Sequence, residues 1–288
     1  MALSIPIVSE YNGKGIDRAI KEFKQLETAG EKAQFAIKKA AIPAALALSG
    51  LAAAAGPAIM AASDLAENLS KVNVVFGEGA TAVEQFAKTA ATALGQSQNA
   101  VLLAAGTFGT FGKAAGLSGQ ELATFSNDFT ALASDLASFN NTTPEQAVQA
   151  IGAALRGESE PLRQFGVLLS DSALRNEALA LGLEVSSGAL SAQTKILAAQ
   201  SLIYKQTGDA QGDFARTSDG LANSSRILKA QMADLQVSIG KALLPAVQAV
   251  LPYVKDFATW AANNPQNFLR AAAAITAIAT AVLAVNFA

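Results

Sequence analysis

A glycine-rich stretch that ends in a lysine is the first segment whose residue types suggest chemistry. It runs Gly106-Thr-Phe-Gly109-Thr-Phe-Gly112-Lys113 and invites comparison with a phosphate-binding loop. Such a loop needs four residues between its first glycine and the Gly-Lys pair, and then a hydroxyl residue. Here five residues separate Gly106 from Gly112, and Ala114 follows the lysine. Glycines spaced three apart leave one side of a helix without side chains. Gly106, Gly109 and Gly112 therefore predict a close helix crossing or a flexible elbow instead.

A group of carboxylates is the second candidate for chemistry. Glu158, Glu160 and Asp171 resemble the paired acids that hydrolyse glycosidic bonds. Nothing beside them suggests a platform for a sugar. The alternative, solvated carboxylates near helix ends with Arg156 and Arg163 as local counterions, therefore fits better.

The chain contains no histidine and no cysteine. This excludes thiolate and imidazole nucleophiles, serine triads with a histidine base, and the usual zinc sites. We therefore expect that the protein is not an enzyme, and we predict no catalytic residue, no metal site and no cofactor.

Composition favours helices packed closely on helices. Of the 288 residues, 51% are hydrophobic and only 15% are charged. Alanine makes up much of the hydrophobic share, glycine adds 22 residues, and small side chains let helices approach one another. The net charge is -2, and no basic residue occurs between Lys113 and Arg156, so we expect no specific nucleic-acid binding.

The segment after Ser118 carries the clearest helix signals. Ser118 and Glu121 form a capping box, and a stripe of large apolar residues follows at steps of three and four. This predicted helix-packing stripe consists of Leu122, Phe125, Phe129, Leu132, Leu136 and Phe139. Thr143-Pro144 then starts a second helix, and Gly157 stops it. A further capping box, Thr81 with Glu84, predicts a helix start at Thr81.

The predicted fold class is mainly α, with amphipathic and Ala/Gly-rich helices in a bundle or an extended coiled-coil-like arrangement. At most, residues 3–8 add a short N-terminal edge strand, because Pro6 confines a strand to an edge. We divide the chain into five segments. They are an amphipathic helix with a short extended lead (1–40), an uncharged Ala-rich segment and connector (41–76), a helical core (77–212), a heptad-containing helix with proline breaks (213–262) and a hydrophobic helix (263–288).

Two segments lack charged side chains. Residues 40–63 are long enough to span a bilayer if helical, and we expect a break near Pro57. This segment is either a buried or lumen-facing helix or one able to enter a membrane. Residues 271–288 are buried in an assembly, insert in a membrane, or continue into a longer natural chain. The N-terminus lacks the basic leader of a secretory signal, so we expect synthesis in the cytoplasm without cleavage.

A heptad pattern marks the best coiled-coil candidate. Leu221, Leu228 and Leu235 recur every seven residues, and Ser225, Met232 and Ile239 fill the alternate positions. The flanking positions carry too few charges to choose a partner, so intramolecular packing and oligomerisation both remain open. Pro245 and Pro252 predict breaks or kinks, and Asn263-Asn264-Pro265 predicts a stop.

Two long stretches resemble one protein family. They are DLASFNNTTPEQAVQAIGAALRGESEPLRQFGVLLSDSAL, which starts at Asp135, and YKQTGDAQGDFARTSDGLANSSRILKAQMADLQVSIGKALLPAV, which starts at Tyr204. Both are similar to the shared core of tail tape measure proteins from long-tailed bacteriophages and related prophages. The resemblance covers roughly residues 16–252 and rests on long ordered stretches.

This resemblance implies a structural virion protein in the lumen of the tail tube. It would set tail length during assembly and be released toward the host membrane during genome delivery. The implied partners are other copies of the chain in a homo-oligomer, the tail tube protein, tail tip or baseplate proteins, tail assembly chaperones and the host inner membrane. Synthesis would take place in the host cytoplasm. A fully helical chain of this length reaches only ~430 Å, so we expect a short family member or the conserved part of one.

Two other classes of function stay open at this stage. A membrane-inserting helical pore-forming protein would explain the two uncharged segments. A peptidoglycan-degrading enzyme is the third class, although no candidate catalytic residue supports it.

Overall fold

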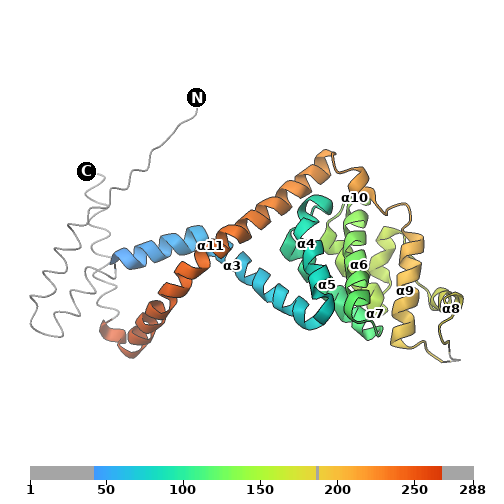
Figure 1. The fold of residues 1–288 in the computed structure, drawn as a ribbon, viewed down its shortest axis with the longest axis horizontal. Coiled ribbons are helices and arrows are strands. Elements are labelled where there is room, and N and C mark those ends of the chain that lie inside the picture. Colours follow the sequence, from blue (N-terminus) through green and yellow to red (C-terminus); the bar gives the residue numbers. More distant parts are fainter. Residues whose placement is uncertain (1–41, 186–187, 268–288) are drawn as a thin grey trace, which may run out of the picture. The chain divides into compact units, whose positions relative to one another are not determined.

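The structure is a computed structural model that describes residues 42–185 and 188–267 (Figure 1). Every regular element in these residues is a helix, which confirms the predicted mainly α fold. The predicted helix and strand within residues 1–40, and nearly all of the predicted hydrophobic helix 263–288, lie outside the described residues. The element order is α3 (Ile42–Phe76), η2 (Gly77–Gly79), α4 (Ala80–Ala93), α5 (Gln98–Ala114), α6 (Gly119–Phe139), α7 (Pro144–Arg156), η3 (Glu160–Phe165), α8 (Asp171–Ala180), α9 (Ala192–Gln206), α10 (Asp213–Arg216) and α11 (Leu221–Asn263).

The chain divides into two compact units. One is Pro57–Leu244, and the other combines Met1–Gly56 with Pro245–Ala288. Both divisions fall at prolines inside long helices, Pro57 in α3 and Pro245 in α11.

The predicted helix breaks at these prolines do not occur. The helix α3 is continuous through Pro57, and α11 is continuous through Pro245 and Pro252. A proline removes one backbone hydrogen bond and adds one local clash, and long helices retain all their other backbone hydrogen bonds. The predicted stop was correct, since α11 ends at Asn263.

Five helices of the unit Pro57–Leu244 form a bundle, in which α4, α5, α6, α7 and α9 stand side by side (Figure 1). Hydroxyl side chains cap the N-termini of three of these helices, α5, α7 and α9. Ser97, Thr143 and Ser191 each accept a hydrogen bond from the backbone N–H three residues later. Each such cap satisfies a donor that the first helical turn leaves without a partner.

Two predicted caps are wrong. Ser118 precedes α6 as expected, but its side chain makes no capping hydrogen bond. The helix α4 begins at Ala80, so Thr81 lies inside the first turn. The chain enters α4 directly from the 3-10 turn η2, and the preceding Gly79 already has helical backbone angles. No extended capping residue is therefore needed there.

The stripe on α6 supplies the centre of the core. Five of its six members are buried, and Phe129 packs its ring against Phe108 of α5 and Tyr204 of α9, with centroid distances of 5.4 and 5.5 Å. Phe139 differs because it is the last residue of α6 and is 54% exposed. The helix therefore buries its stripe up to Leu136, and only its last residue is exposed to solvent.

The three glycines of α5 have different surroundings. A Cβ added at Gly109 would lie 2.5 Å from Phe76 Cζ, and one at Gly112 would lie 2.5 Å from Leu122 Cδ1. At Gly106 the nearest atom is Lys71 Cε at 3.6 Å, an ordinary van der Waals separation. Gly109 and Gly112 therefore lie at close contacts with α3 and α6, whereas Gly106 has room for a methyl group.

Candidate assembly surface on α11

The part of α11 within the unit Pro57–Leu244 has two different faces. One face packs on the bundle and on α3, and it buries Asn223, Ala230 and Val237. The opposite face carries a row of large apolar side chains that are open to solvent. We call these residues the α11 row: Leu221 (89% exposed), Leu228 (60%), Met232 (57%), Leu235 (52%) and Ile239 (48%).

A polar network fixes which face of α11 meets the bundle. Arg226 donates hydrogen bonds to the carbonyl oxygens of Thr142 (2.8 Å) and Ala137 (3.3 Å) and to Asn223 Oδ1. Asn223 donates in turn to Ser138 Oγ at 2.8 Å, and Ser138 donates to Asp213 Oδ2 at 2.6 Å. Side chains from α6, α10 and α11 all contribute, so rotating α11 about its axis would leave the buried Asn223 and its half-buried partners without these hydrogen bonds.

The turn before α11 is held to the same end of α6. Asp135 accepts hydrogen bonds from the backbone N–H groups of Gly212 (2.8 Å) and Phe214 (3.1 Å). The ring of Phe214 is buried. Burial raises the pKa of Asp135, and the two N–H donors partly oppose that shift. Asp135 thus positions α10, and α10 positions the start of α11.

The other end of the packed face crosses α3 at very short range. A Cβ added at Gly240 would lie 1.8 Å from the carbonyl oxygen of Ala58. The two helix backbones therefore touch at this point. Between these anchors at Arg226 and Gly240, α11 presents the part of the row from Leu228 to Ile239 to solvent.

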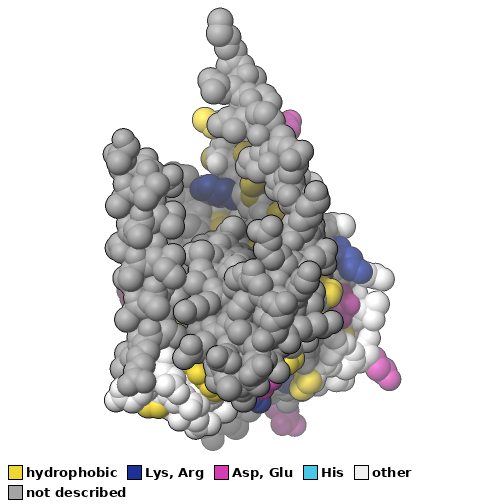
Figure 2. Space-filling view, turned by 90° about the vertical axis from the view of Figure 1, so that its left-hand side faces the viewer, with side chains coloured by type: hydrophobic (Ala, Val, Ile, Leu, Met, Phe, Trp, Pro, Cys, Tyr) yellow, Lys and Arg dark blue, Asp and Glu magenta, His cyan; other side chains and the backbone are white. Residues whose placement is uncertain are grey.

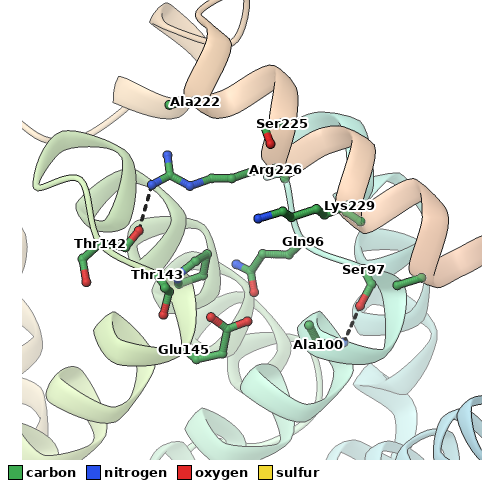
Figure 3. Close-up of a pocket in the computed structure, with 14 residues that line it drawn as sticks. Gln96, Ser97, Ala100, Thr142, Thr143, Glu145, Ala222, Ser225, Arg226 and Lys229 are labelled. Carbon is green, nitrogen blue, oxygen red and sulfur yellow. Dashed lines mark hydrogen bonds between the residues drawn. The ribbon is translucent and has the colours of Figure 1, made fainter.

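A cavity of about 470 Å³ lies between α11 and the N-termini of α5 and α7 (Figure 3). Arg226 and Lys229 reach into it from α11, with Gln96 and Glu145 on the facing side. Its inner polar groups already have partners: Arg226 bonds to Thr142, and Gln96 donates to Ser134 Oγ at 2.6 Å. Within the described residues no group of three or more metal-ligating side chains is found. The cavity therefore carries no constellation that identifies a ligand.

Two buried polar atoms among the described side chains have no hydrogen-bond partner, Asn127 Oδ1 and the Tyr204 hydroxyl. Burial, and then the charges of Asp128 and Asp135, raises the pKa of Tyr204 well above its ordinary value. The phenol therefore stays neutral across the physiological range.

Two of the three carboxylates singled out in the sequence form exposed local ion pairs. Glu158 lies 3.4 Å from Arg156 Nε, and Glu160 lies 3.0 Å from Arg163 Nη1. Asp171 occupies the first turn of α8, which Ser170 caps. These are the counterion and helix-end positions expected of solvated carboxylates.

A buried glutamate joins α8 to α9. Glu177 accepts hydrogen bonds from Lys205 Nζ (2.6 and 2.9 Å) and from Ser201 Oγ (2.5 Å). The Lys205 and Ser201 hydrogen bonds lower the pKa of Glu177 below its ordinary 4.5. Its contribution to stability is therefore present above pH 4.5 and is lost as the pH falls through the lowered value.

We expect acid to loosen α8 specifically. Between pH 7 and pH 3, hydrogen exchange of the α8 amides, corrected for the intrinsic pH dependence, should become several-fold faster. Glu177→Gln should produce the same loss of protection at pH 7 and abolish most of its pH dependence. Glu184→Gln, the same change at an exposed neighbouring position, is the control. Unchanged protection of α8 in Glu177→Gln would contradict this role for the ion pair.

The surface shows no concentration of one charge where Figure 2 colours it. Basic, acidic and hydrophobic side chains are interspersed on the described residues of that face.

No helix in the described part of the chain combines the length and the hydropathy needed to cross a membrane.

Comparisons with known proteins identify no relative. No protein-family model, no curated protein and no solved structure matches the chain.

Proposed function

We propose that this chain is a structural protein of the tail tape measure kind, one that lines up with other helices inside a phage tail tube and sets the length of that tube. The α11 row is the observation that carries the proposal. It is a long apolar surface on a 43-residue helix, and it runs parallel to the helix axis. Such a surface suits lengthwise alignment of helices, whereas a pocket would suit a small ligand.

Two further features support this proposal. The sequence resembles tape measure proteins over stretches that include both the polar anchor of α11 and the row itself. The helix α11 spans about 65 Å at 1.5 Å per residue, a length useful in a confined tube. The proposed partners are other copies of the chain, the tail tube protein, tail tip or baseplate proteins and tail assembly chaperones, with the host membrane reached during genome delivery.

Tail length is the decisive measurement. In the phage or prophage that encodes this chain, helical heptads inserted between Asn263 and Asn264 should lengthen the tail by ~1.5 Å per added residue, seen by electron microscopy. An insertion of the same size in the loop between α8 and α9 serves as a control for nonspecific damage, because that loop returns the chain on itself. Tails of unchanged length with the first insertion, at normal yield, would exclude a ruler function.

A further inference from the structure

We propose that α8 is the centre of a releasable strap, residues 169–185, which Glu177 latches onto α9 at neutral pH and which acid frees while the rest of the bundle stays folded. The surface at this edge of the bundle therefore has two states, latched and open. This switch is a property of the folded chain and does not depend on the proposed function.

The chain is fastened on both sides of the strap. Val167, just before it, is fully buried, and Leu190, after it, is buried as well. Gln206 of α9 also clamps the backbone of Leu168, because its side-chain oxygen accepts from the Leu168 N–H at 2.8 Å and its amide donates to the Leu168 carbonyl oxygen at 3.1 Å. Release of the strap can therefore end at these fixed points without spreading into η3 or α9.

Between the fixed points the chain buries little. Of the residues that the structure describes between Val167 and Leu190, only Glu177 and Ala178 are buried. Leu169 and Leu174 are half-buried against the core cluster. The helix α8 lies at the edge of the bundle and packs on α9 (Figure 1). Segments with so few buried apolar contacts open at a lower free energy than the core that they cover.

The strap also reverses the usual arrangement of polar and apolar side chains. A helix on a protein surface normally buries its leucines and exposes its carboxylates. Here Glu177 is buried, whereas Leu179 at the end of α8 and Leu181 just after it are exposed. Burial of these two leucines therefore does not hold the strap in place, and the hydrogen bonds of Glu177 become decisive. Such local conflicts with the normal pattern are expected where a structure has to change.

The latch responds to acid from one side only. Glu177 is bonded to Lys205 and Ser201 of α9, and Lys205 stays positively charged in acid. The Lys205 and Ser201 hydrogen bonds lower the pKa of Glu177, so the latch is complete above pH 4.5 and weakens as the pH falls through the lowered value. The other ionisable side chains of the two helices are Lys195 and Tyr204 on α9 and Asp171 and Arg175 on α8.

Release opens a groove between the strap and α9. The groove has a volume of about 450 Å³, and Leu181 and Leu183 of the strap form one wall, opposite Leu197 and Tyr204 of α9. The buried Tyr204 hydroxyl has no hydrogen-bond partner in the latched state, and water that enters the open groove can supply one. Because a helix of 10 residues is not stable by itself, release also unfolds α8. The open state is thus marked by a cleavable chain at α8 and by exposed apolar surface.

Trypsin tests the latch at neutral pH, because Arg175 lies in the middle of α8 and cleavage after it requires that α8 unfold. At pH 7.5, cleavage of Glu177→Gln after Arg175 should be about tenfold faster than that of the natural chain. Glu184→Gln, the same change at an exposed position of the strap, is the control and should match the natural chain. Cleavage after Lys205 in α9 should stay equally slow in all three. Equal cleavage of Glu177→Gln and Glu184→Gln after Arg175 would overturn the proposal.

A locked variant tests the response to acid. The double variant Glu177→Leu/Lys205→Met replaces the ion pair by an apolar pair, which holds α8 on α9 independently of pH. At pH 3.5 the natural chain should bind anilinonaphthalene sulfonate, a dye for exposed apolar surface, with several-fold higher fluorescence than at pH 7, and the locked variant should show no such rise. Far-UV circular dichroism should show that both chains keep the helices of the bundle. An equal rise in both chains, or loss of the whole helical signal in the natural chain, would mean that acid does not act through this latch.

Discussion

Phe129→Ala should lower the free energy of unfolding by about 4 kcal/mol, the largest loss expected from any single side chain of the α6 stripe. Phe129 is fully buried and contacts three aromatic rings, with centroid distances of 4.9 Å to Phe125, 5.4 Å to Phe108 and 5.5 Å to Tyr204. Truncation removes the burial and these contacts together. It also leaves a cavity at the junction of α5, α6 and α9, where several helices would have to move to fill it.

Phe139→Ala is the matched control, because it makes the same chemical change ten residues later on the same stripe. Phe139 is mostly exposed at the end of α6, so its truncation should change stability by no more than about 0.5 kcal/mol. Urea unfolding followed by circular dichroism measures both. Equal losses for the two variants would mean that the stripe does not organise the core as the structure shows.

The contrast between these two phenylalanines illustrates how far the sequence predicts the fold. Periodicity places both on one helix face, because it registers only the angle of a residue about the helix axis. It does not register where along that axis the neighbouring helices end. The sequence predicts helix starts best where the stabilising contact is local. Ser97, Thr143 and Ser191 cap helices because the cap needs only a hydroxyl and the backbone N–H three residues later.

The candidate site depended on contacts that the sequence does not reveal. Leu221, Leu228 and Leu235 are predicted as a heptad, but whether they face the bundle or solvent depends on the other side of α11. That side is selected by Arg226 and Asn223, which bond to residues more than 80 positions earlier or to a turn formed by Thr217. The run of small polar residues before α11 signals a turn, but it does not identify the acceptors on α6.

The helix crossing at Gly240 was missed for a related reason. Glycines spaced three apart drew attention to α5, yet the closest backbone approach involves a lone glycine in α11 and Ala58 in α3. One glycine within a long helix is an ambiguous signal, since it weakens a helix whether or not another chain segment passes nearby. Only the packing of α3 on α11 distinguishes the two cases.

Gly240→Ala should therefore destabilise the protein by about 3 kcal/mol, at the upper end of the range for overpacked cores. The new methyl group would lie 1.8 Å from the Ala58 carbonyl oxygen and 2.9 Å from Ala62 Cβ. The first of these atoms belongs to a helix backbone and cannot rotate aside, so α3 and α11 must separate. Separation exposes Leu65 and Val237, which are buried in the same core cluster.

Gly106→Ala makes the same replacement inside a helix where there is space. Its nearest neighbour would be the flexible Lys71 side chain at 3.6 Å, and alanine favours helix over glycine by about 0.5–1 kcal/mol. We expect Gly106→Ala to unfold at an equal or slightly higher urea concentration than the natural chain, and Gly240→Ala at a clearly lower one. Should Gly240→Ala match Gly106→Ala, the two helices cannot touch at this point, and the α11 row would lose one of the two anchors that hold it toward solvent.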